Sequence, residues 1–146
     1  MRRYFGGTLG CRRFAIWGLS FKPCADDLRD APSVRIIRAL LDESCAVSAH
    51  DPWALDSARR IFGGSLEYHQ DAYEALDGAD GLVVCTEWPE FRNPDFLRIA
   101  GLLKTPVIFD GRNLYDPERV TESGLDYICI GRPDRLLNRA SCRQER

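Results

Sequence analysis

Short apolar segments alternate with amphipathic segments along the chain. The apolar runs have the length and composition of strands and cover residues 13–21, 46–51, 81–86, 106–111 and 126–131. Strands that alternate with helical patterns predict parallel β-α-β units. Crossovers in such units are right-handed, which predicts a doubly wound sheet. We therefore expect an α/β, Rossmann-like fold: an open, mainly parallel sheet with helices on both faces.

Four helices are predicted between these strands. The first two carry apolar residues at helical spacing on one face: Val34, Ile37, Leu40 and Leu41, then Leu55, Ala58, Ile61 and Phe62. The third is short, with Asp71 as its N-cap, Glu74 completing a capping box and Gly78 ending it. The fourth is predicted to begin at Asn93, with Pro94 as its first helical residue.

The two ends of the chain differ from its middle. Residues 13–132 hold all the predicted strands, and a chain of 146 residues suits one compact domain. Residues 1–12 contain a glycine pair, Gly6-Gly7, and basic residues without a full element. Residues 133–146 are basic and poor in apolar positions, so we expect a disordered tail there.

Composition excludes several classes of protein. The net charge of −2 gives no reason to expect nucleic acid or an anionic membrane as a partner. No apolar run approaches the ~20 residues that span a bilayer, and the N-terminus lacks a signal-peptide core. None of the six cysteines forms a C-x-x-C pair, which argues against a zinc site. We expect reduced thiols in a cytoplasmic protein, with Cys85 and Cys129 packed in the core.

The segment after the first strand, Trp17–Ser33, departs from a dinucleotide-binding turn. It has one glycine, Gly18, where such a turn carries G-x-G-x-x-G. Lys22 and Arg29 either neutralise phosphates or pair with the neighbouring acids Asp26, Asp27 and Asp30. Without the glycines the backbone cannot closely approach a pyrophosphate, so we do not expect NAD in this turn.

Further polar residues follow the other strands, where open parallel sheets bind ligands. Asp51 is either a ribose-binding acid or part of an Asp-Pro turn, and its distance from Gly18 favours the turn. Glu87 has no second carboxylate or histidine at a defined spacing, and neither His50 nor His69 belongs to a recognisable triad. Arg112, after Gly111, either contacts a ligand or pairs with Asp110 or Asp116.

Several segments together resemble one family, the UDP-glucose/GDP-mannose dehydrogenases, and in particular its C-terminal, UDP-binding domain. The resemblance runs from about Phe5 to Arg132 and is closest to the UDP-glucose 6-dehydrogenase branch. GDP-mannose and UDP-N-acetylmannosamine dehydrogenases are the alternatives. The motifs that carry it are AIWGLSFKPCADDLRDAPS, AHDP, YEALDGADGLVVCTEWPEF, PVIFDGRNLYDP and YICIGRP.

The resemblance implies two domains, one that binds NAD and one that binds the nucleotide sugar. Enzymes of this family oxidise a nucleotide sugar with NAD, which a separate N-terminal domain holds, and they form homodimers. The C-terminal domain holds the UDP part of UDP-glucose. By this resemblance, Phe21, Lys22 and Arg112 match substrate-contacting positions, and Arg29 matches an arginine on the NAD side of the cleft. Residues 1–12 resemble the junction between the domains.

One family feature has no counterpart in this chain. The family's catalytic cysteine lies in a glycine-rich motif, GFGGSCFPKD-like, and none of the six cysteines has that context. We therefore assign no catalytic residue and no metal site, and expect the chain alone to bind no NAD and to catalyse no oxidation. The alternatives to a domain of a dehydrogenase are a separate UDP-sugar-binding module and the remnant of a truncated enzyme.

Overall fold

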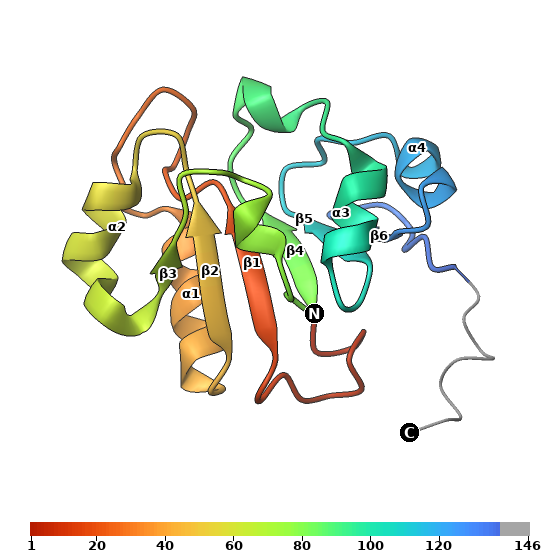
Figure 1. Cartoon of the computed structure of the whole chain (residues 1–146), viewed down its shortest axis with the longest axis horizontal. Helices are drawn as coiled ribbons and strands as arrows, with labels where there is room; N and C mark the ends of the chain where they lie inside the picture. The colour runs from red at the N-terminus through yellow and green to blue at the C-terminus, as the bar shows by residue number, and fades with distance from the viewer. Residues whose placement is uncertain (138–146) are drawn as a thin grey trace.

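A six-stranded parallel sheet forms the centre of the computed structural model, which describes residues 1–137 (Figure 1). The strand order is β3-β2-β1-β4-β5-β6, and every neighbouring pair is parallel. This order reverses direction between β1 and β4, as in dinucleotide-binding folds, and confirms the predicted architecture. The strands are β1 (Arg13–Trp17), β2 (Ala46–His50), β3 (Glu67–Tyr68), β4 (Gly81–Val84), β5 (Val107–Asp110) and β6 (Asp126–Cys129).

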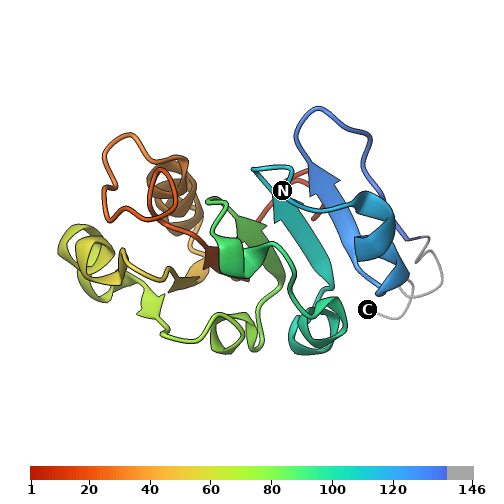
Figure 2. The same ribbon diagram turned by 90° about the horizontal axis from the view of Figure 1, so that it is seen from above.

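Helices cover both faces of the sheet (Figure 2). The α-helices are α1 (Pro32–Asp42), α2 (Leu55–Phe62), α3 (Phe96–Leu102) and α4 (Pro117–Glu122). Three 3₁₀ turns join them: η1 (Gly63–Ser65), η2 (Glu74–Leu76) and η3 (Pro89–Phe91). Helix α1 lies behind the sheet in Figure 1, whereas η2 and α3 lie in front of it. No helix within residues 1–137 is both long and apolar enough to cross a bilayer.

The pleat of each strand divides the core into two layers. Phe14 and Ile16 of β1 pack in the layer beneath α1 and α2, while the alternate residues Ala15 and Trp17 pack in the layer beneath α3 and α4. Alternate residues of the other central strands likewise point into opposite layers. Because both faces are covered, the central strands read as continuous apolar runs rather than as alternating ones.

Three of the predicted helix details differ from the structure. The third helix is only the 3₁₀ turn η2, although Asp71 does accept hydrogen bonds from the Tyr73 and Glu74 N–H groups. Helix α3 is capped by Asp95 and not by Asn93, because the Asp95 carboxylate accepts from the Arg98 N–H. Ile61, predicted on the inner face of the second helix, is 44% exposed.

Both ends of the described chain contact the sheet domain. Leu9 is buried in the core layer beneath α1, and the partly buried side chains of Tyr4 and Phe5 pack against the same layer. We predicted a disordered tail from residue 133, but Arg135 exchanges two backbone hydrogen bonds with Tyr127 of β6. The pairing satisfies backbone groups at the edge of the sheet, which explains why the chain returns there. The remainder of the predicted tail, 138–146, lies outside the described residues.

Candidate functional site

Strand β1 ends at Trp17, and the chain turns sharply at the next residue, Gly18. The φ angle of Gly18 is +90°, which side chains disfavour, and a Cβ there would lie 2.5 Å from the Cβ of Thr86. The first loop therefore crosses directly over the end of β4. The predicted strand, which continued to residue 21, is shorter for this reason.

The loop that follows, residues 18–31, is fixed at its base. Thr86 donates its hydroxyl to the Ser20 carbonyl at 2.6 Å, and Ser20 donates its own hydroxyl to the Lys22 carbonyl at 2.9 Å. The Ser33 hydroxyl at the start of α1 donates to the Leu19 carbonyl. Serine and threonine hydroxyls thus hold the loop where a glycine-rich turn would leave its backbone free.

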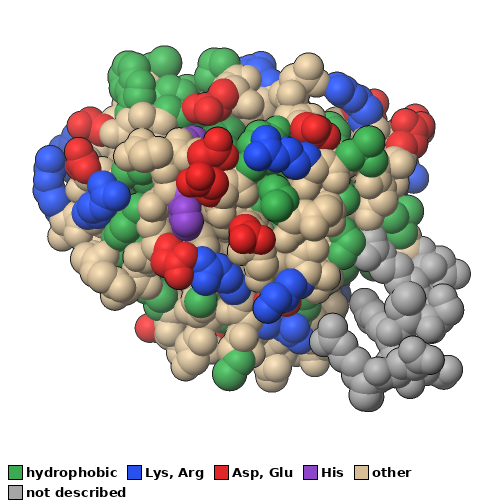
Figure 3. Space-filling view, in the orientation of Figure 1, with side chains coloured by type: hydrophobic (Ala, Val, Ile, Leu, Met, Phe, Trp, Pro, Cys, Tyr) green, Lys and Arg blue, Asp and Glu red, His purple; other side chains and the backbone are tan. Residues whose placement is uncertain are grey.

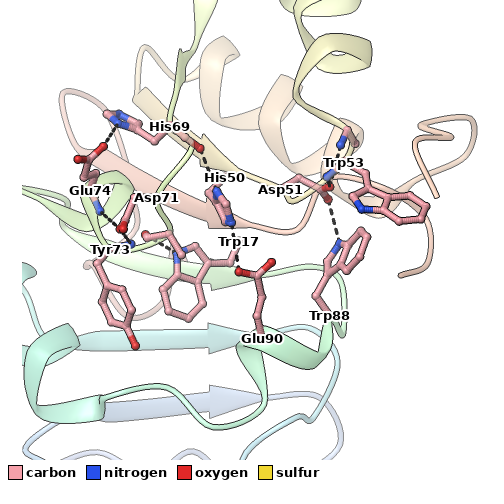
Figure 4. A network of polar contacts seen from close by, with 12 residues as sticks. Trp17, His50, Asp51, Trp53, His69, Asp71, Tyr73, Glu74, Trp88 and Glu90 are labelled. Atoms are coloured by element: carbon pink, nitrogen blue, oxygen red, sulfur yellow. Dashed lines mark hydrogen bonds and ion pairs between the residues drawn. The ribbon is translucent and has the colours of Figure 1, made fainter. Parts of the chain in front are cut away.

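Asp51, at the end of β2, connects this loop with two other segments (Figure 4). Its carboxylate is buried and accepts from the Leu19 N–H at 2.7 Å and from the Trp88 indole N–H at 3.2 Å. It also accepts from the N–H groups of Trp53 and Ala54, which confirms a turn at this position. Because these donors occupy both carboxylate oxygens, Asp51 does not fit the role of a ribose-binding acid.

Phe21 and Lys22 lie at the exposed tip of the loop. The Phe21 N–H donates to the Asp27 carbonyl at 3.1 Å, which closes the tip on itself, and the Phe21 side chain is 54% exposed. Lys22 forms no ion pair within residues 1–137. Its ammonium group is therefore available to an anionic ligand.

Arg29 lies further along the same loop and pairs with Asp27. The guanidinium group donates to both carboxylate oxygens, and this interaction lowers the pKa of Asp27 to about 2. The pairing with a neighbouring acid that we considered is thus present for Arg29 and absent for Lys22 in the described residues. Arg29 borders an open hollow of about 490 Å³ between the loop, α1 and α2.

Arg112 follows β5 at the same edge of the sheet. Its backbone N–H donates to the Asp110 carboxylate at 2.8 Å, and its guanidinium group pairs with Glu87 at 3.0 Å. The side-chain partner is thus neither Asp110 nor Asp116. Buried Asp110 also accepts from the Tyr127 hydroxyl, and burial together with this hydrogen bond raises the pKa of Tyr127.

A second polar network lies beside the site, on the face that carries η2 and η3 (Figure 4). His50 is buried, and its Nδ1 donates to the His69 carbonyl oxygen at 2.9 Å, while its Nε2 lies 3.8 Å from the Glu90 carboxylate. Acidic and basic side chains are interspersed over this face (Figure 3). Within residues 1–137 no three ligand side chains are grouped so that they could hold a metal ion.

The cysteine that follows β4 at this edge, Cys85, is not an activated nucleophile. Cys85 follows β4 and is buried, and burial raises the pKa of its thiol to about 12. A thiol with this pKa remains protonated at neutral pH and is a weak nucleophile. Cys85 therefore fits the predicted role of a small core residue, as part of the layer beneath α1.

The sequence-predicted residues thus lie on loops that follow different strands at one edge. Phe21, Lys22 and Arg29 belong to the loop after β1, and Arg112 belongs to the loop after β5. Sequence reasoning missed the pairing of Glu87 with Arg112. The one signal for this pairing in the sequence was the position of Glu87 directly after the apolar run 81–86, at the edge where Arg112 was expected.

Comparison with known proteins identifies the family. Residues 15–117 match the model of the UDP-glucose/GDP-mannose dehydrogenase family, UDP binding domain. The chain is 46% identical over 134 residues to the UDP-glucose 6-dehydrogenase of Pseudomonas aeruginosa, covering 88% of this chain and 30% of that protein. It is 43% identical over 129 residues to the UDP-glucose 6-dehydrogenase of Rhizobium meliloti, covering 88% of this chain and 29% of that protein.

Solved structures agree with this result. A UDP-glucose dehydrogenase from Pyrobaculum islandicum superposes with a TM-score of 0.72 at 31% identity, over 87% of this chain and 27% of that chain. The NDP-N-acetyl-D-galactosaminuronic acid dehydrogenase of Methanosarcina mazei gives a TM-score of 0.76 at 25% identity, over 90% of this chain and 27% of that chain. The chain spans less than a third of each of these proteins. It belongs to the UDP-glucose/GDP-mannose dehydrogenase family and corresponds to the family's UDP-binding domain.

Proposed function

We propose that this chain is the part of a UDP-glucose 6-dehydrogenase that holds the UDP portion of UDP-glucose. In the complete enzyme, UDP-glucose is oxidised to UDP-glucuronate with NAD. The relatives named UDP-glucose 6-dehydrogenase support this assignment over the GDP-mannose and UDP-N-acetylmannosamine alternatives. We expect the chain alone to be catalytically incomplete.

One observation supports the proposal most strongly: two cationic side chains come from loops on either side of the central reversal in strand order. Lys22 follows β1 and Arg112 follows β5, with β4 between these strands. Open α/β sheets bind ligands outside the carboxyl ends of their strands at such a reversal. Lysine and arginine there suit the phosphates of a nucleoside diphosphate, and Phe21 adds an exposed aromatic surface.

NAD does not fit the first turn of this chain. The single Gly18 is followed by a loop fixed by hydroxyl groups, and the Asp51 carboxylate is occupied by backbone and indole donors. We therefore assign NAD to a separate domain, which this chain contacts as a partner. Arg29, exposed on the outer part of the loop, is proposed to reach that NAD. A homodimer in the complete enzyme is part of the same proposal.

The test is a titration of variants of Arg112 with UDP. Arg112→Ala removes a charge-assisted contact of about 1.5–3 kcal/mol, so UDP and UDP-glucose should bind about ten- to a hundredfold more weakly. Arg112→Lys should restore part of the affinity, because a point charge cannot replace the planar guanidinium group. Calorimetric titration measures each dissociation constant.

Arg92 supplies the control for this series. It is exposed after η3 and has no ion pair within residues 1–137, so Arg92→Ala removes the same charge near the same edge. This variant should bind UDP like the parent. Parent-like binding by Arg112→Ala would refute the assignment of Arg112. Unfolding of Arg112→Ala would instead give the arginine a structural role.

A further inference from the structure

Glu87 holds one edge of the Arg112 guanidinium group. Its two carboxylate oxygens accept from Nε at 3.3 Å and from Nη2 at 3.0 Å, so the pair is bidentate. The two side chains are 35% and 36% exposed, so the pair lies at the surface of the sheet edge without being fully solvated. A two-point contact of this kind fixes the plane of the guanidinium group as well as its position.

The opposite edge of the same group remains available. A guanidinium group carries five N–H donors, and Glu87 uses the Nε donor and one on Nη2. Within residues 1–137, no hydrogen bond involves Nη1 of Arg112. The group can therefore bind a second anionic oxygen pair without releasing Glu87.

The backbones on both sides of this pair are themselves fixed. Arg112 donates its backbone N–H to buried Asp110 at 2.8 Å. Glu87 lies between Thr86 and Trp88, which are both buried and bonded to the first loop and to Asp51. The rotation of the arginine side chain is thus the main remaining freedom, and Glu87 restricts it.

We propose that Glu87 is a positioning residue that presents the free edge of Arg112 to the phosphates of a nucleoside diphosphate. The proposal rests on the proposed function, because it assumes that UDP contacts Arg112. Orientation of the arginine before the ligand arrives reduces the entropy lost on binding. The opposite possibility is that Glu87 occupies Arg112 in place of the ligand and must be displaced.

Calorimetric titration of Glu87 variants with UDP distinguishes a Glu87 that positions Arg112 from a Glu87 that competes with the ligand. Glu87→Gln has the same size but only one acceptor oxygen, so it cannot hold both arginine donors. We expect about three- to tenfold weaker binding of UDP. Glu87→Asp keeps the charge but is one methylene shorter, and it should weaken binding similarly. In the Arg112→Ala background, Glu87→Gln should have no further effect.

Glu90→Gln is the matched control, because it removes the same charge from an exposed residue three positions further along. It should bind UDP like the parent, and all variants should keep the melting temperature of the parent within a few degrees. Tighter binding by Glu87→Gln, or parent-like binding by Glu87→Asp, would overturn the proposal. An equal loss from Glu87→Gln with and without Arg112 would do so as well.

The outcomes also separate this proposal from the proposed function. If the parent chain does not bind UDP, the function and the positioning role both fail. If the parent binds UDP but Arg112→Ala binds equally well, UDP binding stands and the role of Glu87 is refuted.

Discussion

The carboxylate of Asp51 accepts hydrogen bonds from three segments that are separate in the sequence. One oxygen serves the loop after β1 and the Trp88 indole, and the other serves the turn into α2. Trp53, 59% exposed, packs edge-on against Trp88 above this carboxylate. A single buried side chain thus fixes the base of the loop that carries Phe21 and Lys22.

Asp51→Asn should therefore destabilise the domain. The amide has one acceptor oxygen, and its NH₂ group would face backbone donors that are buried with it. Each buried donor left without an acceptor costs about 1–3 kcal/mol, so the free energy of unfolding should fall by at least about 2 kcal/mol. Urea unfolding measures this change.

Asp56→Asn is the control for that measurement. Asp56 lies on the exposed face of α2 and pairs with Arg59 one turn later, an interaction of at most about 0.5 kcal/mol. If Asp51→Asn were as stable as Asp56→Asn, the network around Asp51 would contribute little to the fold.

Residue-level contacts were only partly predictable. The sequence placed Lys22 and Arg112 directly after predicted strands. Because the carboxyl ends of parallel strands lie at one edge of the sheet, this edge could be predicted for both residues without knowing their side-chain contacts. The side-chain partner of Arg112 was not predictable, because Glu87 is 25 positions away and on another loop. Asp110 was the nearer candidate, but its carboxylate accepts from backbone groups and from Tyr127.

The first β-loop-α element depends on close contact between β1 and β4. Gly18→Ala would place a methyl group 2.5 Å from Thr86 and would require an unfavourable φ of +90°. Backbone strain and overpacking each cost about 1–3 kcal/mol, so we expect a loss of at least about 2 kcal/mol. In a domain of this size the melting temperature should fall by at least about 4 °C.

Gly64→Ala provides the comparison within the same protein. No atom lies within 4 Å of the Cβ that this change would add, and the backbone there is not left-handed. Its melting temperature should stay equal to that of the parent or rise slightly. Equal melting temperatures for the two alanine variants would show that the contact between Gly18 and Thr86 is not tight in solution.

Helices and strands were predicted correctly where their apolar pattern was long, and their prediction failed where that pattern was short. Helix α1 has eleven residues and its apolar face was predicted correctly, whereas α4 has six and was missed. The two-residue edge strand β3 was also missed. At the start of α3, Asn93 and Asp95 are both possible caps by residue type, and the position of the first helical turn selects Asp95.

On the scale of the whole molecule, the strand order positions the candidate site. The strand order reverses between β1 and β4, and open α/β sheets bind ligands outside the carboxyl ends of their strands at such a reversal. The sequence predicted this architecture because five of the strands are continuous apolar runs, a pattern typical of sheets covered on both faces. The chain covers 30% of the Pseudomonas aeruginosa relative, so it supplies one wall of a larger binding site in our proposal.

Calorimetric titration of the 146-residue chain with UDP, UDP-glucose, GDP-mannose and NAD tests the central claim most directly. A single wall buries less of a ligand than a complete pocket, so UDP should bind weakly. UDP-glucose should bind with similar affinity, because in our proposal this chain holds the UDP portion of the ligand and makes few contacts with the sugar. GDP-mannose and NAD should give no saturable binding at the same concentrations. Absence of UDP binding, or an affinity for UDP-glucose far above that for UDP, would contradict the account.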